Sequence, residues 1–97
     1  MKPVSFLGDS LDAIRSFPEG PRRTIGYQIE RVQRTLEPDD WKSMKAIGPG
    51  VREIRVRAAA GAFRVIYIAT MMDAIYVLHA FHKRSQATSK RDLDLAV

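Results

Sequence analysis

The order of its segments predicts an α+β fold for this chain. A short apolar run is followed by two segments with helical spacing, then by three consecutive strand-like segments and a short capped tail. Strands that follow one another through short turns pair antiparallel, and helices grouped before them pack together on one face of the sheet. The expected architecture is two N-terminal helices on one face of a mainly antiparallel sheet of about four strands, with a short C-terminal helix.

The first strand and the first helix are both expected to be short. Residues 4–7 form an apolar run that we assign to a strand, and Asp9 or Ser10 then offers a helix N-cap. Helical spacing follows in the apolar residues Leu11, Ile14 and Phe17. The helix should end at the break Pro18-Glu19-Gly20-Pro21, because proline and glycine disfavour a continuous helix.

A longer helix is predicted over residues 21–36, ending before Pro38. Its apolar positions recur at i, i+4, i+7 and i+11 and form one stripe: Ile25, Ile29, Val32 and Leu36. Residues 39–47 are expected to be an irregular or short helical connection. Gly48-Pro49-Gly50 then predicts a turn.

Three strands are predicted in the second half of the chain, over residues 51–57, 62–69 and 74–82. The link at residues 58–61 and the turn Met71-Met72-Asp73 are short enough to make two consecutive hairpins. The tail at residues 88–93 has the pattern of a capped short helix.

Alternation along these strands separates two faces of the sheet. If Arg57 pairs with Ala62, then Arg55 lies directly opposite Arg64. The helices are expected to pack on Ile54, Val56, Phe63, Val65, Tyr67, Tyr76, Leu78 and Ala80. One end of the other face should carry Arg55, Arg57, Arg64, His79, Phe81 and Lys83, and its other end Ile66, Ile68, Ile75 and Val77. Like charges opposite one another are unfavourable unless compensated, so this cluster indicates a phosphate-binding surface.

Composition narrows the classes of function. The 97 residues make one small domain, and a net charge of +5 favours a polyanionic or acidic partner. The chain has no cysteine, which removes thiol chemistry, and no acidic residue is spaced to complete a metal site with the two histidines. We therefore expect no metal and no cofactor. No apolar run is long enough to span a membrane, and no signal-peptide pattern opens the chain, so a cytoplasmic location is expected.

Arginine, lysine and histidine side chains suit the chemistry of phosphodiesters. Arginine and lysine bind the phosphate and stabilise transition-state charge, and a histidine near neutral pKa moves a proton. RNA cleavage without a metal needs little more, because the 2′-hydroxyl of the substrate supplies the nucleophile. His79, flanked by Leu78 and Ala80, fits a core histidine better than a catalytic one, and His82, where the last strand runs out, is the better candidate.

The chain resembles the phage-derived, HigB-like branch of the RelE/ParE toxin superfamily. The resemblance is carried by Val51-Arg-Glu-Ile-Arg-Val-Arg57, by Gly61-Ala-Phe-Arg64 and by the run from Ile75 to Arg84. It implies one RelE-like domain over residues 1–97. It also implies a toxin of a type II toxin–antitoxin pair, an endoribonuclease that cuts mRNA on the ribosome and is neutralised by a helix-turn-helix antitoxin.

The resemblance also assigns roles to residues. Arg64, of the Gly-x-Phe-Arg motif, is expected to face the scissile phosphate, and Arg55 to share that catalytic role. Arg57, Lys83 and Arg84 are expected to seat the RNA backbone, and His82 to act as acid or base. No tyrosine follows Lys83, where the RelE branch carries its catalytic tyrosine.

Two other functions fit the same sequence. The absent tyrosine leaves open a ParE-like inhibitor that binds DNA gyrase without RNA chemistry. It equally leaves open a catalytically degenerate module that serves only to bind an antitoxin. The predicted function, an mRNA endoribonuclease toxin, rests mainly on the resemblance.

Overall fold

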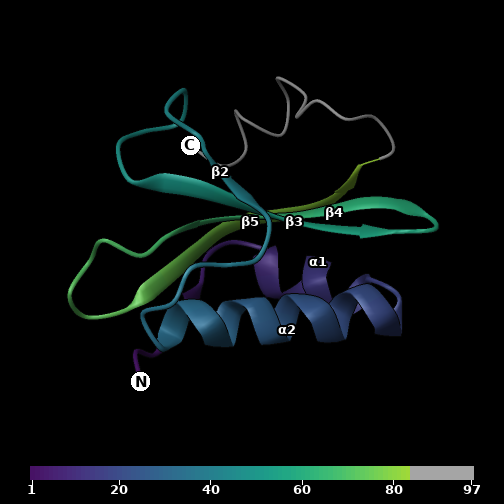
Figure 1. Cartoon of the computed structure of the whole chain (residues 1–97), viewed down its shortest axis with the longest axis horizontal. Helices are drawn as coiled ribbons and strands as arrows, with labels where there is room; N and C mark the ends of the chain where they lie inside the picture. Colours follow the sequence, from purple (N-terminus) through teal and green to yellow (C-terminus); the bar gives the residue numbers. More distant parts are fainter. Residues whose placement is uncertain (84–97) are drawn as a thin grey trace.

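A computed structural model describes residues 1–83 of the chain, and its centre is a five-stranded sheet (Figure 1). The strand order is β1-β5-β4-β3-β2, and all neighbours pair antiparallel except β1 and β5, which are parallel. The strands are β1 (Val4–Phe6), β2 (Trp41–Ser43), β3 (Val51–Ala58), β4 (Gly61–Ile68) and β5 (Ile75–Lys83). The predicted α+β class and the mainly antiparallel sheet are confirmed.

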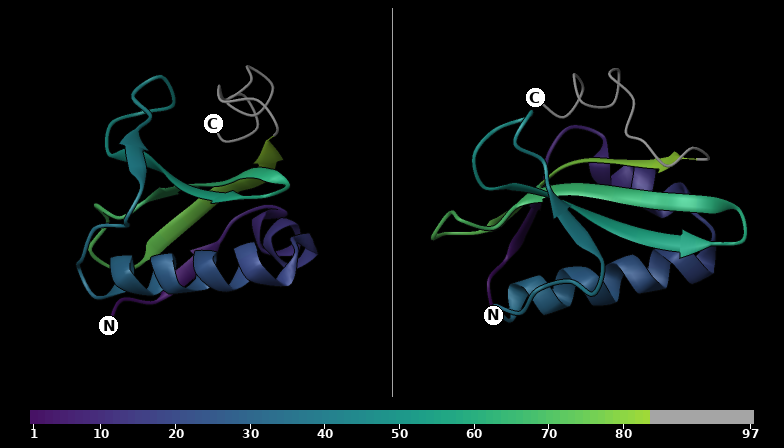
Figure 2. Two further views of the ribbon diagram at one scale, coloured as in Figure 1. Left: turned by 45° about the vertical axis from the view of Figure 1, so that its right-hand side comes forward. Right: turned by 45° about the horizontal axis from the view of Figure 1, so that its top comes forward.

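The two helices lie on one side of this sheet, as predicted (Figures 1 and 2). They are α1 (Ser10–Ser16) and α2 (Glu19–Gln33). The apolar stripe of α2 at Ile25, Ile29 and Val32 packs against β3, β4 and β5, and Ile25 is fully buried. Neither helix of residues 1–83 is long and apolar enough to cross a membrane. The helix predicted at residues 88–93 lies outside the described residues.

Strand β2 replaces part of the irregular connection that the sequence predicted. Trp41 pairs with Ile54 and Ser43 with Arg52, so the sheet has five strands rather than about four. The Arg52 guanidinium lies 4.0 Å from the centre of the Trp41 ring, and the Arg55 amide donates to the Asp40 carbonyl at 2.9 Å. These long-range contacts stabilise a strand too short to show a period in the sequence.

The pairing of β3 with β4 is the predicted one. Arg57 lies opposite Ala62 and Arg55 opposite Arg64. The side of β3 and β4 that faces the helices therefore carries Ile54, Val56, Phe63, Val65 and Tyr67, all of them buried. The arginines lie on the opposite side.

The predicted faces of β5 are correct only in its second half. Ala80 lies opposite Val65 as expected, but Tyr67 pairs with Val77 and Ile66 with His79, so Leu78 is an extra residue. This bulge reverses the alternation before it. Ile75 and Val77 consequently pack under the helices, whereas Leu78 joins a smaller cluster with Met44, Val51, Ile66 and Phe81 on the other face.

The same bulge moves the Tyr76 side chain to the opposite face of the sheet from the predicted one. It was expected in the core, yet it is partly exposed, and its hydroxyl donates to the Asp73 carboxylate at 2.6 Å. That hydrogen bond holds the pKa of the exposed Asp73 carboxyl below its usual value. Tyr76 thus caps the turn before β5 rather than filling the core.

Helix α2 ends three residues before the predicted boundary, at a Schellman motif. The Leu36 amide donates to the Arg31 carbonyl at 2.9 Å and the Thr35 amide to the Val32 carbonyl at 3.0 Å. Thr35 takes the left-handed conformation that the motif requires, with φ 64°. Leu36 is therefore turned out of the predicted stripe and is 50% exposed.

Replacing Thr35 by glycine is expected to raise the free energy of unfolding by about 1 kcal/mol, because a β-branched residue is disfavoured at positive φ. Urea unfolding followed by circular dichroism would measure the change. Thr24→Gly, inside the same helix, is the matched control and should lower stability by about 0.5 kcal/mol. Equal losses in both variants would contradict the assigned motif.

Candidate functional site

Four basic side chains gather on the side of the sheet that the helices leave open. We call Arg55, Arg57, Arg64 and Lys83 the arginine face. Strand pairing places them in two rows: Arg57, Ala62 and Lys83 lie side by side, and Arg55, Arg64 and Phe81 form the next row. The structure therefore brings together the four arginine and lysine residues that the sequence placed at this end of the face.

A carboxylate that sequence analysis missed lies in the middle of this face. Glu53 is fully buried, and its Oε1 accepts a hydrogen bond from Nη1 of Arg64 at 2.8 Å. The same oxygen lies 3.5 Å from Nε of Arg55. Glu53 is two residues before Arg55 on the same strand and diagonal to Arg64, so one carboxylate reaches both arginines.

Glu53 compensates the repulsion between the two opposed arginines. The opposed Arg55 and Arg64 form a compensated, largely buried network with Glu53, so their juxtaposition by itself demands no phosphate. The Arg64 side chain is 3% exposed, whereas that of Arg55 is 23% exposed and makes the longer contact with Glu53. Of the two, Arg55 can exchange the carboxylate for an incoming anion at lower cost.

Arg57 and Lys83 form the accessible part of the face. The Arg57 side chain is 60% exposed, and its Nε lies 3.6 Å from the Asp40 carboxylate. Such surface pairs contribute about 0–1 kcal/mol and open readily. Lys83 is partly exposed at the end of β5. Within residues 1–83, the four cations of this face outnumber the two carboxylates of Glu53 and Asp40.

His82 lies on the other side of the sheet from Arg64. Strand β5 continues to Lys83, so alternation directs His82 toward the helix side, where its ring stacks on Phe63 at 4.3 Å. Its Nε2 donates to the Ala60 carbonyl at 2.7 Å. The histidine on the arginine face is His79, which is buried opposite Ile66 and stacks on Phe81 at 5.3 Å. Arg84 lies outside the described residues.

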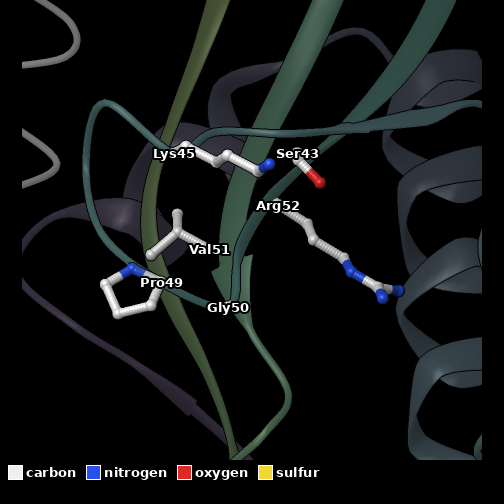
Figure 3. Close-up of a pocket in the computed structure, with 6 residues that line it drawn as sticks. All are labelled: Ser43, Lys45, Pro49, Gly50, Val51 and Arg52. Atoms are coloured by element: carbon white, nitrogen blue, oxygen red, sulfur yellow. The ribbon is translucent and has the colours of Figure 1, made fainter.

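A hollow of about 470 Å³ lies beside the β2–β3 connection, lined by Ser43, Lys45, Pro49, Gly50, Val51 and Arg52 (Figure 3). In this view the Lys45 side chain points toward Ser43, whereas the Arg52 side chain extends away toward the helix (Figure 3). Within residues 1–83, no three His, Asp or Glu side chains converge as metal ligands. The arrangement as a whole offers cationic binding groups.

A mixed sheet with two helices on one face and an arginine face on the other defines a compact α+β domain. The family described as "Phage derived protein Gp49-like (DUF891)" matches residues 12–97. The chain belongs to this phage-derived, Gp49-like family, which covers nearly the whole sequence.

Comparison with solved structures finds a similar chain in the RelB-RelE antitoxin-toxin complex from Methanococcus jannaschii. The TM-score is 0.57 at 19% identity, and the match covers 79% of this chain and 87% of that chain. No curated protein matches the sequence. At this identity the likeness establishes the fold. The prediction of a phage-derived chain with a RelE-like fold is confirmed.

Proposed function

We propose that this protein is the toxin of a type II toxin–antitoxin pair and cleaves mRNA on the ribosome. The family and the RelE-like fold support a toxin, since the similar structure is that of an antitoxin–toxin complex. The observation that carries the nuclease proposal is the arginine face, because Arg57 presents its guanidinium group to solvent and Arg55 lies partly exposed beside it on the same strand. Guanidinium groups bind phosphate oxygens through paired hydrogen bonds.

The proposed reaction uses the nucleophile of the substrate. The RNA 2′-oxygen attacks the adjacent phosphorus, the bond to the 5′-oxygen breaks, and a cyclic phosphate and a 5′-hydroxyl result. Arg55 would exchange the Glu53 carboxylate for the phosphate and bind it. Arg64 would contribute its positive charge beside the same phosphate. Arg57, Lys83 and Arg84 would seat the backbone. The arginines would stabilise the charge that develops on the phosphate oxygens.

His82 remains the proposed acid or base, and its position at the edge of the sheet supports one path for the RNA. Strand β1 pairs with β5 only at residues 75–77, so in the described part of the chain the rest of β5 borders the sheet edge. An RNA strand that crosses this edge meets Lys83 on one face and the exposed His82 on the other. His82 would then reach the substrate from the helix side of the sheet, although Lys83 and the arginines lie on the other side.

The proposal is tested by producing the protein alone in bacteria from an inducible gene. We expect growth to stop and transcripts to be cut within translated regions, mapped by primer extension and absent when translation is blocked first. Intact transcripts together with a DNA-damage response would instead indicate a gyrase inhibitor and would exclude the nuclease.

His82→Gln is expected to slow cleavage about 10²-fold, because a positioned acid or base contributes on that order. RNA affinity, measured by fluorescence anisotropy, should change less than twofold. His79→Gln is an unsuitable comparison because His79 is buried. Unchanged cleavage by a folded His82→Gln protein would remove His82 from the mechanism.

The burial of Arg64 against Glu53 favours one alternative, a module that binds an antitoxin without cutting RNA. In that case the arginine network would serve folding alone. Normal growth on induction, together with tight binding of a helix-turn-helix protein encoded beside this gene, would support the alternative over the nuclease.

A further inference from the structure

A second cavity lies on the helix side of the sheet, away from the arginine face. Its volume is about 250 Å³, and it opens between the C-terminal end of α2 and the ends of β3 and β4. The residues that matter for its chemistry are Lys2, Val32, Leu36, Glu37, Arg52 and Tyr67. Its size fits an amino-acid side chain better than a nucleotide.

Tyr67 supplies a buried polar group in this cavity. The residue is 1% exposed and lies opposite Arg52 in the β3–β4 pairing. The Arg52 guanidinium lies beside its hydroxyl, and the hydroxyl proton has no acceptor within the part of the chain that the structure describes. Burial raises the pKa of Tyr67, and the neighbouring Arg52 guanidinium only partly opposes this. The hydroxyl is therefore protonated at neutral pH and can donate a hydrogen bond.

The charge lining the cavity favours an anion. Arg52 is stacked on Trp41, and its Nη1 lies 3.5 Å from the Glu37 carboxylate, which is a loose and partly exposed pair. Lys2 adds a second cation, and its Nζ donates to the carbonyl oxygens of Ala69 and Met71 at 3.0 and 2.7 Å. Two cations and one carboxylate thus line the cavity together with the Tyr67 donor.

The cavity also has an apolar side. Val32 is buried at its wall, and Leu36 is 50% exposed where the Schellman motif turns it out of the helix. The N-terminus runs beside the same end of α2, where the Lys2 amide donates to the Gln33 carbonyl at 3.2 Å (Figure 1). Both the N-terminal segment and the C-terminal end of α2 therefore border the cavity, and a hydrogen bond joins them.

We propose that this cavity binds a carboxylate side chain of an acidic peptide segment from a partner protein. The carboxylate accepts hydrogen bonds from the Tyr67 hydroxyl and the Arg52 guanidinium, and an adjacent apolar side chain of the segment packs on Leu36. The site does not depend on the proposed RNA chemistry. A segment bound here leaves the arginine face uncovered, because the two sites lie on opposite sides of the sheet.

The test uses the full chain with 13C-labelled tyrosine rings, observed by NMR. The probe is the blocked peptide acetyl-Ala-Leu-Glu-Leu-Ala-amide, and the same peptide with glutamine in place of glutamate is the neutral control. We expect the glutamate peptide to shift the Tyr67 resonance saturably and the glutamine peptide to leave it unchanged. Equal shifts with both peptides, no saturable shift, or equally tight binding of inorganic phosphate would overturn the proposal.

Tyr67→Phe separates binding from folding. Because the hydroxyl proton has no internal acceptor to lose, the variant should be about as stable as the parent protein, yet bind the glutamate peptide about tenfold more weakly. Its binding can be followed through the Trp41 fluorescence. Tyr76→Phe is the matched control, since its hydroxyl bonds Asp73 outside the cavity, and should bind normally. Unchanged affinity in Tyr67→Phe would refute the assigned donor.

Discussion

Arg64→Met is expected to lower the free energy of unfolding by about 3–5 kcal/mol, which is the largest loss predicted for any single change in this protein. Glu53 is fully buried, and the variant removes the guanidinium that lies 2.8 Å from its carboxylate. A buried carboxylate that loses its closest cation bears the desolvation penalty with less compensation. Urea unfolding measures the loss.

The double variant Glu53→Leu/Arg64→Met should recover most of that stability. Replacing both partners of a buried pair by apolar residues of similar volume is often neutral or stabilising. The matched control is Arg57→Met, which breaks an exposed pair with Asp40 and should cost less than about 1 kcal/mol. If Arg64→Met cost no more than this control, the buried pair would not be the stabilising contact inferred here.

This result also governs how Arg64 is tested as a catalytic residue. Loss of toxicity in an Arg64→Ala protein would be ambiguous, because the variant destabilises the fold and removes a proposed phosphate ligand at once. The double variant keeps the fold while it lacks the arginine. Cleavage by the double variant therefore measures the chemical role of Arg64 separately from its structural role.

Arg55→Gln is expected to slow mRNA cleavage about 10²–10³-fold while the protein stays folded. Arg55 is the partly exposed member of the Glu53 network, and its longer contact with the carboxylate allows it to turn to a phosphate. Arg55→Lys should retain part of the activity, because lysine keeps the charge but not the two-pronged hydrogen bonding of arginine. Cleavage of ribosome-bound mRNA over time supplies the rates.

Arg23→Gln is the control for charge alone. Its side chain is 79% exposed on α2 and forms a surface ion pair at 2.9 Å with solvent-exposed Glu19 across one helical turn, on the helix side of the sheet. It removes the same charge from the molecule far from the arginine face. Equal slowing by Arg23→Gln and Arg55→Gln would mean that overall charge, and not the position of Arg55, supports cleavage.

The hairpin of β3 and β4 was predictable because two short-range signals agree. Alternation in residues 51–57 and 62–69 separates charged from apolar side chains, and the short link at residues 58–61 leaves one register that keeps the arginines out of the core. Arg55 therefore faces Arg64 as predicted. The apolar stripe of α2 was predictable because Ile25, Ile29 and Val32 recur at the spacing of one helix face.

The faces of β5 were not predictable. Leu78 and His79 both lie on the outer face because the bulge adds one residue to β5. Since β5 carries apolar side chains on both faces, the alternation of apolar and polar residues in its sequence does not reveal where that extra residue lies. Strand β2 was missed because three residues cannot show alternation, and the end of α2 because a threonine occupies the left-handed position where glycine is usual.

The sequence alone determined the composition of the arginine face, since strand periodicity and a short hairpin specify which side chains share a side. Only the tertiary structure decided what those charges do for the fold. Glu53 becomes the partner of Arg64 through its diagonal position on the neighbouring strand, and burial makes that ion pair strong. The extension of β5 to Lys83 likewise places His82 on the opposite side. The burial of Glu53 and the length of β5 depend on how the whole sheet packs, and no local pattern in the chain encodes them.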